Sequence, residues 1–205
     1  MLDGPAGHIE VLVDLPQGDP VGLAMVAHPH PKPGGSAEHK IPALLARSLA
    51  HAGWLAVRPN FRGVGRSQGT HDEGVGETDD LLVVLRELRQ ATPGLRVALT
   101  GFSFGAFVVA RAVRRLVDEG AAPWRTALAG VPSGEAAGGR SYDTPGPIPQ
   151  ALVVHGELDE SVPLQQVLDW ARPHRQPVTV VPGADHFFTG SVHVLRDLVL
   201  EHLRL

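Results

Sequence analysis

One serine stands in a setting that would make it a nucleophile. Ser103 lies between two phenylalanines in the stretch GFSFGA, with Gly101 two residues before it and Gly105 two residues after. A strand pattern ends here and a helix pattern begins, so the serine sits on a tight strand-to-helix turn. Glycine at both positions provides the space that a Cβ atom would fill in such a turn. The stretch predicts a presented hydroxyl and an oxyanion donor in the N–H of Phe104. An ordinary turn with a helix-capping serine is the alternative.

Serine chemistry requires two further groups. Histidine is suited to take the hydroxyl proton because its pKa lies near neutral pH, and a carboxylate must hold the tautomer of that histidine. The acid candidate is Asp159 in VVHGELDESVP, where Glu157 and Glu160 are rivals and a helix cap is the alternative role. The base candidate is His186 in VVPGADHFFTG, on a loop before the last helix, with Asp185 as a further acid beside it.

These residues are far apart in the sequence, so the fold must bring them together. Short aliphatic runs alternate with longer helical patterns, which is the signature of a mostly parallel sheet with helices on both faces. In such α/β folds ligands bind beyond the carboxyl ends of the strands, where all three residues stand. We expect one α/β domain over residues 1–205. Strands are predicted at 8–15, 21–29, 54–61, 96–103, 125–132, 150–158 and 177–183, helices at 37–52, 76–91, 105–118, 163–172 and 190–205, and loops at 62–76 and 132–147.

The composition limits the kind of protein. The chain has 205 residues, a net charge of −4 and 43% hydrophobic residues, which suits a globular domain and predicts no surface for nucleic acid. It has no cysteine, which excludes thiolate nucleophiles and cysteine-bound metals. The sequence shows no signal peptide and no apolar run of membrane-spanning length, so we expect a cytoplasmic protein. Both a monomer and a homodimer fit the sequence.

The chain resembles the α/β-hydrolase superfamily over nearly its whole length, and more narrowly the small lidless bacterial serine hydrolases. The resemblance rests on AHPHP, NFRGVGRS, GFSFGA, HGELDESVP and GADHFF, which occur in this order at predicted strand ends. It implies that Ser103 is the nucleophile, Asp159 the acid and His186 the base. It also implies a second oxyanion donor in the HPHP loop, where the N–H of His30 is the candidate because prolines have none. Many relatives carry a cap domain where this chain has only residues 133–147, which implies an open cleft.

The remaining polar motifs favour structural roles. His28-x-His30 lacks the further ligands close behind that a metal pair needs, so we expect no metal and no cofactor, with both rings bonded to loop backbone. The glycine-rich stretch 63–69 lacks the helix and the lysine of a phosphate loop. Arg62 is expected to pair with a carboxylate and hold that loop, with substrate binding as the minor alternative. Its candidate partners are Asp72, Glu77 and Asp80.

The predicted function is hydrolysis of carboxylic esters or thioesters with small or flexible acyl groups, through an acyl-enzyme and with a small-molecule ester as partner. Esterases, thioesterases, lipases and small-amide hydrolases share this machinery. The alternative is a catalytically inert hydrolase-fold module that serves only in binding. Phe61, Phe102 and Phe187, together with Phe104 and Phe188, either line the cleft or pack beneath it.

Overall fold

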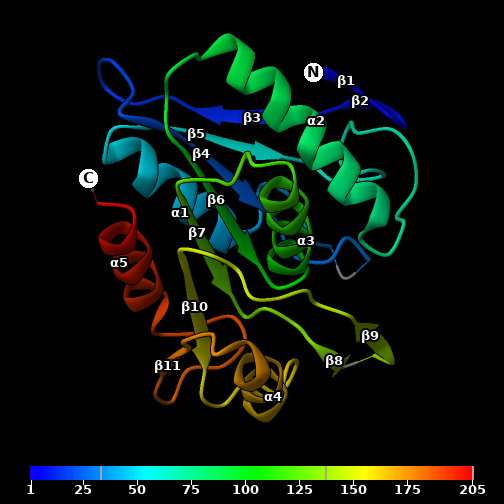
Figure 1. Cartoon of the computed structure of the whole chain (residues 1–205), viewed down its shortest axis with the longest axis vertical. Coiled ribbons are helices and arrows are strands. Elements are labelled where there is room, and N and C mark those ends of the chain that lie inside the picture. The colour runs from blue at the N-terminus through cyan, green and yellow to red at the C-terminus, as the bar shows by residue number, and fades with distance from the viewer. Residues whose placement is uncertain (33, 137, 205) are drawn as a thin grey trace.

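A seven-stranded sheet runs through the protein (Figure 1). The structure is a computed structural model that describes residues 1–32, 34–136 and 138–204. The strand order is β11-β10-β7-β6-β4-β5-β3, and every neighbouring pair is parallel except β3 and β5. The predicted α/β fold is therefore confirmed. The strands are β3 (Val11–Asp14), β4 (Gly22–Ala27), β5 (Trp54–Pro59), β6 (Val97–Phe102), β7 (Arg125–Ala129), β10 (Ala151–Gly156) and β11 (Thr179–Val181).

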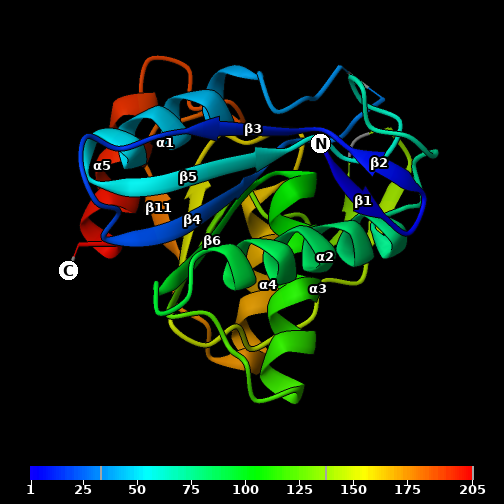
Figure 2. The same cartoon turned by 90° about the horizontal axis from the view of Figure 1, so that it is seen from above.

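Five helices of the described part of the chain cover the two faces of this sheet. Figure 2 shows α1 and α5 on one side of the strands and α2, α3 and α4 on the other. All five were predicted and agree within a few residues, although Leu205 of the predicted last helix lies outside the described residues. The helices are α1 (Lys40–His51), α2 (Val75–Ala91), α3 (Phe104–Asp118), α4 (Leu164–His174) and α5 (Val192–His202).

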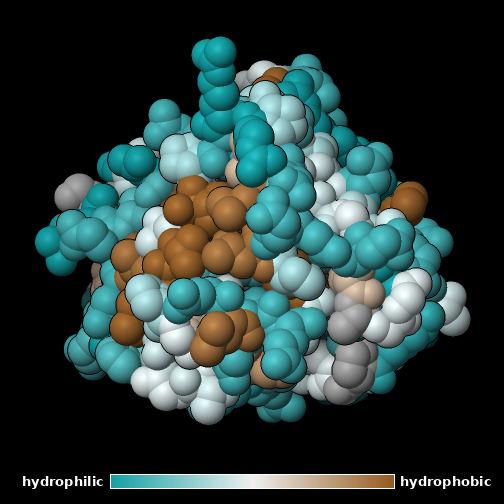
Figure 3. Space-filling model, turned by 90° about the horizontal axis from the view of Figure 1, so that it is seen from below, coloured by the Kyte–Doolittle hydropathy of each residue, from teal (hydrophilic) through white to brown (hydrophobic). Residues whose placement is uncertain are grey.

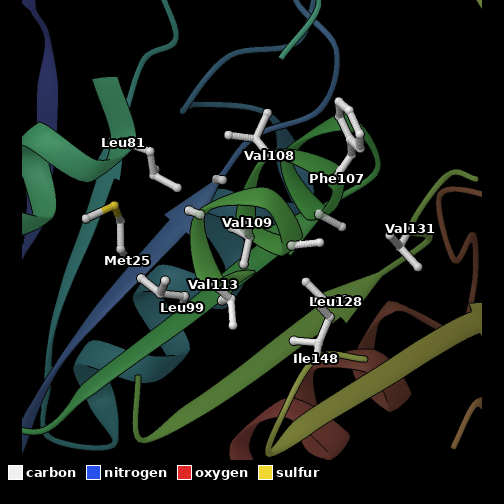
Figure 4. Close-up of a cluster of buried hydrophobic side chains, with 14 of the residues drawn as sticks. Met25, Leu81, Leu99, Phe107, Val108, Val109, Val113, Leu128, Val131 and Ile148 are labelled. Atoms are coloured by element: carbon white, nitrogen blue, oxygen red, sulfur yellow. The ribbon is translucent and has the colours of Figure 1, made fainter. Parts of the chain in front are cut away.

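The core is divided by the sheet because successive strand residues point to opposite faces. In β4, Leu23 and Met25 join the cluster under α2, α3 and α4, whereas Ala24 and Val26 join the cluster under α1 and α5. Figure 4 shows side chains of α3 packed against those of β4, β6 and β7 in the first cluster. Both faces are buried, which explains why the strands read as continuous apolar runs rather than alternating ones.

No helix of the described residues combines the length and the apolar character that crossing a bilayer requires.

The single strand predicted at 8–15 is wrong, because the chain divides it at Glu10. Residues before the division form β2 (Gly7–Ile9), which pairs with β1 (Leu2–Gly4) in an antiparallel hairpin, and residues after it form β3. The backbone of Glu10 instead bonds to the loop after β5, with its N–H donating to Ser67 Oγ at 2.9 Å. Its carboxylate accepts from the N–H and guanidinium of Arg66, which lowers the pKa of Glu10 to about 2.

The unstructured loop predicted at 132–147 contains a small hairpin. Its strands are β8 (Gly134–Ala136) and β9 (Arg140–Tyr142), which pair antiparallel at the lower right of Figure 1. Strands of three residues are too short to show a period, so the sequence pattern gave no signal for them.

Arg62 holds the glycine-rich loop, as predicted, and its partner is Asp80. The guanidinium donates from Nε and Nη2 to the two carboxylate oxygens of Asp80 at 2.7 and 2.8 Å. Nη2 also donates to the carbonyl oxygen of Gly76 at 2.8 Å. The side chains of Arg62 and Asp80 are 12% and 5% exposed, so this pair is buried against α2. Asp72 lies farther away, at 3.8 Å from Nη1.

Removing the charge of Asp80 should destabilise the protein. Asp80→Asn leaves the guanidinium of Arg62 buried without its counter-ion, and we expect a loss of about 3 kcal/mol in the free energy of unfolding. Asp79→Asn is the matched control. Asp79 also lies on α2, but it pairs with Arg115 of α3 where both side chains are partly exposed, so this substitution should cost less than about 1 kcal/mol. Urea unfolding followed by circular dichroism measures both. Equal midpoints for the two variants would contradict this account of Arg62.

Candidate active site

Three side chains from distant parts of the chain meet beyond the carboxyl ends of β6, β10 and β11. The Nε2 atom of His186 lies 2.9 Å from Ser103 Oγ, and its Nδ1 atom lies 2.7 Å from Asp159 Oδ2. Figure 1 shows the three strands running toward the same edge of the molecule. Because a carboxylate only accepts hydrogen bonds, Nδ1 of His186 carries the proton and Nε2 is left to accept the proton of the serine hydroxyl.

The turn at Ser103 is strained and tightly packed. Ser103 has φ 55° and ψ −125°, a backbone conformation that residues other than glycine rarely adopt. A Cβ atom at Gly101 would lie 2.6 Å from the backbone of Ala106, and one at Gly105 would lie 2.5 Å from the carbonyl oxygen of His28. Both glycines are thus required by close backbone approach. The second one lets the start of α3 lie directly against the end of β4.

Asp159 is held so that one carboxylate oxygen faces the imidazole. Its Oδ1 atom accepts from the N–H groups of Ser161 and Val162 at 2.9 and 2.8 Å, which leaves Oδ2 for His186. The side chain is 1% exposed. Because α4 begins only at Leu164, Asp159 does not cap that helix, and the alternative role is wrong.

A buried histidine that the sequence analysis left aside also touches this carboxylate. His155 is fully buried at the end of β10, with Nε2 2.8 Å from the carbonyl oxygen of Val162 and 3.3 Å from Asp159 Oδ2. Burial lowers the pKa of His155, which favours the neutral ring. Both acceptors face Nε2, so that atom carries the proton. The only sequence signal for His155 was a histidine within an apolar strand. That signal fits a ring packed in the core as well as a ring that contacts Asp159.

The rival acids are engaged elsewhere. Glu157 Oε2 accepts from the N–H of Gly183 at 2.8 Å, and Asp185 Oδ1 accepts from the N–H of Thr189 at 2.8 Å. Glu160 is exposed to solvent. None of the three makes a hydrogen bond with His186 in the described part of the chain.

The two predicted oxyanion donors lie on neighbouring segments. Phe104 is the first residue of α3, and His30 follows β4 in the loop that α3 abuts. Their rings are in contact, with centroids 4.9 Å apart. Among the described residues, neither N–H group donates a hydrogen bond to a backbone or side-chain acceptor, so both are available to a ligand.

The side chains of His28 and His30 are bonded to loop backbone, as the sequence predicted. His28 is fully buried, with Nδ1 2.7 Å from the carbonyl oxygen of Pro29 and Nε2 accepting from the N–H of Phe61 at 3.0 Å. Nδ1 of His30 accepts from the N–H of Lys32 at 3.2 Å. Burial lowers the pKa of each of the two imidazoles to about 4, so both are neutral at pH 7.

A cavity of about 240 Å³ opens beside the serine. Phe187 lines it and is 49% exposed, but Phe61 and Phe102 do not: they are 2% and 0% exposed and belong to the two core clusters. The expectation that Phe61 and Phe102 line the cleft is therefore wrong, because each points from a strand end into the packed layer beneath. The lining residues are Pro29, His30, Gly35, His39, Ser103, Pro132, Ala136, Arg140, Tyr142, Ser161, Val162, His186 and Phe187.

Figure 3 views the side toward which β6, β7 and β10 run, and shows apolar surface gathered near the centre with hydrophilic residues around it. Exposed apolar side chains beyond the strand ends include Leu158 after β10 and Phe187 after β11, at 60% and 49% exposed.

One group of described residues could hold a metal ion. Possible ligand atoms of His30, His71 and Glu73 all lie within 4.8 Å of one another. Nδ1 of His71 lies 2.8 Å from the buried carboxylate of Glu77, and Nε2 lies 3.5 Å from Glu73 Oε1. The Nζ atom of Lys32 lies 3.6 Å from Glu73 Oε1, so a positive charge already stands beside the three possible ligands. His28 is not a member, because both of its ring nitrogens face the backbone.

Comparison with known proteins assigns the fold of this chain to a family. Residues 33–119 match the family described as alpha/beta hydrolase fold. The chain is 32% identical over 214 residues to the uncharacterized protein RP471 of Rickettsia prowazekii, covering 98% of this chain and 87% of that protein.

Two solved structures are similar over almost the whole chain. XC6422 from Xanthomonas campestris, described as an α/β serine hydrolase without lid, is 38% identical with a TM-score of 0.86, covering 99% of this chain and 91% of that one. An α/β serine hydrolase homologue from Coxiella burnetii is 35% identical with a TM-score of 0.82, covering 99% and 95%. The chain belongs to the α/β-hydrolase family.

The buried neutral ring of His28 should make the protein sensitive to acid. Its pKa is about 4 in the folded state and near 6.5 when unfolded, so between these values the unfolded chain binds more protons and acid favours unfolding. We expect His28 to lower the free energy of unfolding by about 1 kcal/mol for each unit that pH falls near pH 5. Urea unfolding between pH 7 and pH 4.5 measures this slope. His28→Gln, which does not titrate, should have a shallower slope, and an unchanged slope would rule out this role for His28.

Proposed function

We propose that the protein is a serine hydrolase that cleaves carboxylic esters or thioesters of small or flexible acyl groups. The observation that carries the proposal is the line of hydroxyl, imidazole and carboxylate, with 2.9 Å between Ser103 Oγ and His186 Nε2 and 2.7 Å between His186 Nδ1 and Asp159 Oδ2. These distances lie within the range of direct proton transfer between side chains. The relatives described as serine hydrolases support the same reaction class.

Acylation follows from the placement of these groups. Ser103 Oγ attacks the ester carbonyl carbon while His186 Nε2 takes the hydroxyl proton, and Asp159 stabilises the resulting imidazolium. The carbonyl oxygen becomes an oxyanion, which accepts hydrogen bonds from the N–H groups of Phe104 and His30. Each such donor contributes about 3 kcal/mol to stabilising the transition state. His186 then gives its proton to the leaving alcohol or thiol, and the acyl group remains on Ser103.

Deacylation uses the same groups with water as the nucleophile. The neutral ring of His186 takes a proton from water, and the hydroxide attacks the acyl-enzyme carbonyl. The second oxyanion collapses, the proton returns to Ser103 Oγ through His186, and the carboxylic acid leaves. A cavity of about 240 Å³ is small for a ligand pocket, which favours short or flexible acyl groups.

Substituting the serine tests the proposal directly. Ser103→Ala should lower kcat for p-nitrophenyl acetate by about 10³-fold or more, because the nucleophile is lost and only binding and oxyanion contacts remain. Release of p-nitrophenol by purified protein, corrected for spontaneous hydrolysis, measures it. Turnover that survives unchanged in Ser103→Ala would remove the hypothesis.

Substituting the acid tests the assignment of Asp159 over its rivals. Asp159→Asn removes the charge that stabilises the imidazolium, and we expect kcat to fall by about 10²-fold to 10⁴-fold. Asp185→Asn is the control, because Asp185 adjoins His186 in sequence but bonds to Thr189, and it should keep kcat within about twofold. Steady-state kinetics on the same ester compare the two. A larger loss of kcat in Asp185→Asn than in Asp159→Asn would show that Asp159 is not the catalytic acid.

A further inference from the structure

The turn that carries Asp159 is held to the end of β10 by the imidazole of His155. Nε2 of His155 donates to the carbonyl oxygen of Val162 at 2.8 Å. The N–H of the same residue, Val162, donates to Asp159 Oδ1 at 2.8 Å. Val162 is therefore bonded to the strand through its carbonyl group and to the acid through its N–H group. A loss of the bond from His155 reaches the carboxylate through a single residue.

Nε2 of His155 also lies beside the carboxylate oxygen that faces His186. It is 3.3 Å from Asp159 Oδ2, and the same oxygen lies 2.7 Å from Nδ1 of His186. The side chains of His155 and Asp159 are 0% and 1% exposed, so solvent screens this contact little. Burial lowers the pKa of His155 against the raising effects of the bond to Val162 and of the charge on Asp159. The ring therefore presents a neutral N–H dipole to the carboxylate.

Packing alone does not account for an imidazole at this position. Nδ1 of His155 is buried and makes no hydrogen bond within the described part of the chain. An unpaired buried polar atom destabilises the folded state, and a leucine of similar volume would leave no such atom. Val153, two residues earlier on the same face of β10, is apolar and belongs to the core cluster under α2, α3 and α4. What the ring adds at residue 155 is the Nε2 group, and that group faces Val162 and Asp159.

We propose that His155 is a positioning residue that holds the carboxylate of Asp159 in the orientation that His186 requires. The inference rests on the proposed function, because it adds a side chain to the same machinery. His155 does not line the cavity beside Ser103, so it acts on the reaction through Asp159. Without its N–H group the turn of residues 159–162 gains freedom and the carboxylate points less accurately at His186. The imidazolium that forms during acylation is then less stabilised.

The test separates the donor of the ring from its volume. His155→Gln places an amide N–H group near the position of Nε2, whereas His155→Leu fills a similar volume without a donor. His155→Met also lacks a donor and takes the place of His155→Leu if that variant does not fold. Val153→Ala is the matched control, because it removes buried methyl groups from the same face of β10 but lies outside the turn that carries Asp159. The measurement is kcat for p-nitrophenyl acetate, with the fold of each variant checked by circular dichroism.

We expect His155→Leu to lower kcat by about tenfold, because a misplaced catalytic group slows the reaction by up to about 100-fold. His155→Gln should keep kcat within about threefold of wild type, and Val153→Ala within about twofold. A double-mutant cycle with Asp159→Asn adds a readout that a purely structural role would not change. In that background His155→Leu should change kcat by less than about twofold, because the orientation of a neutral amide does not stabilise an imidazolium.

Four results would overturn the role of His155. They are an unchanged kcat in His155→Leu, an equal fall in His155→Gln and His155→Leu, an equal fall in Val153→Ala, and a tenfold fall that persists beside Asp159→Asn. Each of them would leave the hydrolase intact, because turnover would still depend on Ser103. Failure of the proposed function would look different, since the wild-type protein would then show no turnover that Ser103→Ala abolishes.

Discussion

The contact between the first turn of α3 and the ends of β4 and β6 is the constraint on which the site depends. Only glycine fits at positions 101 and 105, because a Cβ atom there would collide with backbone from the neighbouring segment. This contact fixes the strained backbone of Ser103 and sets the start of α3 beside the loop that contains His30. The nucleophile and both candidate oxyanion donors are therefore positioned by backbone packing, with little freedom left to side chains.

Buried carboxylates hold the loops around this contact. Glu77 is fully buried and accepts from the N–H groups of Asp72 and Gly74 and from the ring of His71. Asp159 is satisfied in the same way by two N–H groups and by His186. A buried carboxylate that accepts several hydrogen bonds orders the segments that supply the donors. The edge of the cleft is thus built from loops whose polar groups are already paired, which suits a site without a lid.

The sequence was most informative where one residue type is required by chemistry at a strand end. Ser103, Asp159 and His186 could be selected because each follows an apolar strand, and the structure brings them together. Burial was less predictable: a phenylalanine at a strand end faces either the cleft or the core, and only packing decides, which is why Phe61 and Phe102 were misplaced.

Short and irregular elements escaped prediction for a similar reason. The strands β8 and β9 have three residues each, so no hydrophobic period distinguishes them from a loop. The division at Glu10 depends on hydrogen bonds to residues 60–67, which no local pattern reveals. Arg62 had three possible partners in sequence, and only the direction in which α2 packs brings Asp80 to it.

Reaction with a fluorophosphonate is the most direct measure of whether Ser103 is an activated nucleophile. Such a reagent is attacked by a serine oxygen and leaves a stable phosphonyl group, which peptide mass spectrometry locates. The account predicts one adduct, on Ser103, that forms at neutral pH and forms far more slowly in His186→Gln. A folded protein that stays unmodified, or that is modified at another residue, would contradict it.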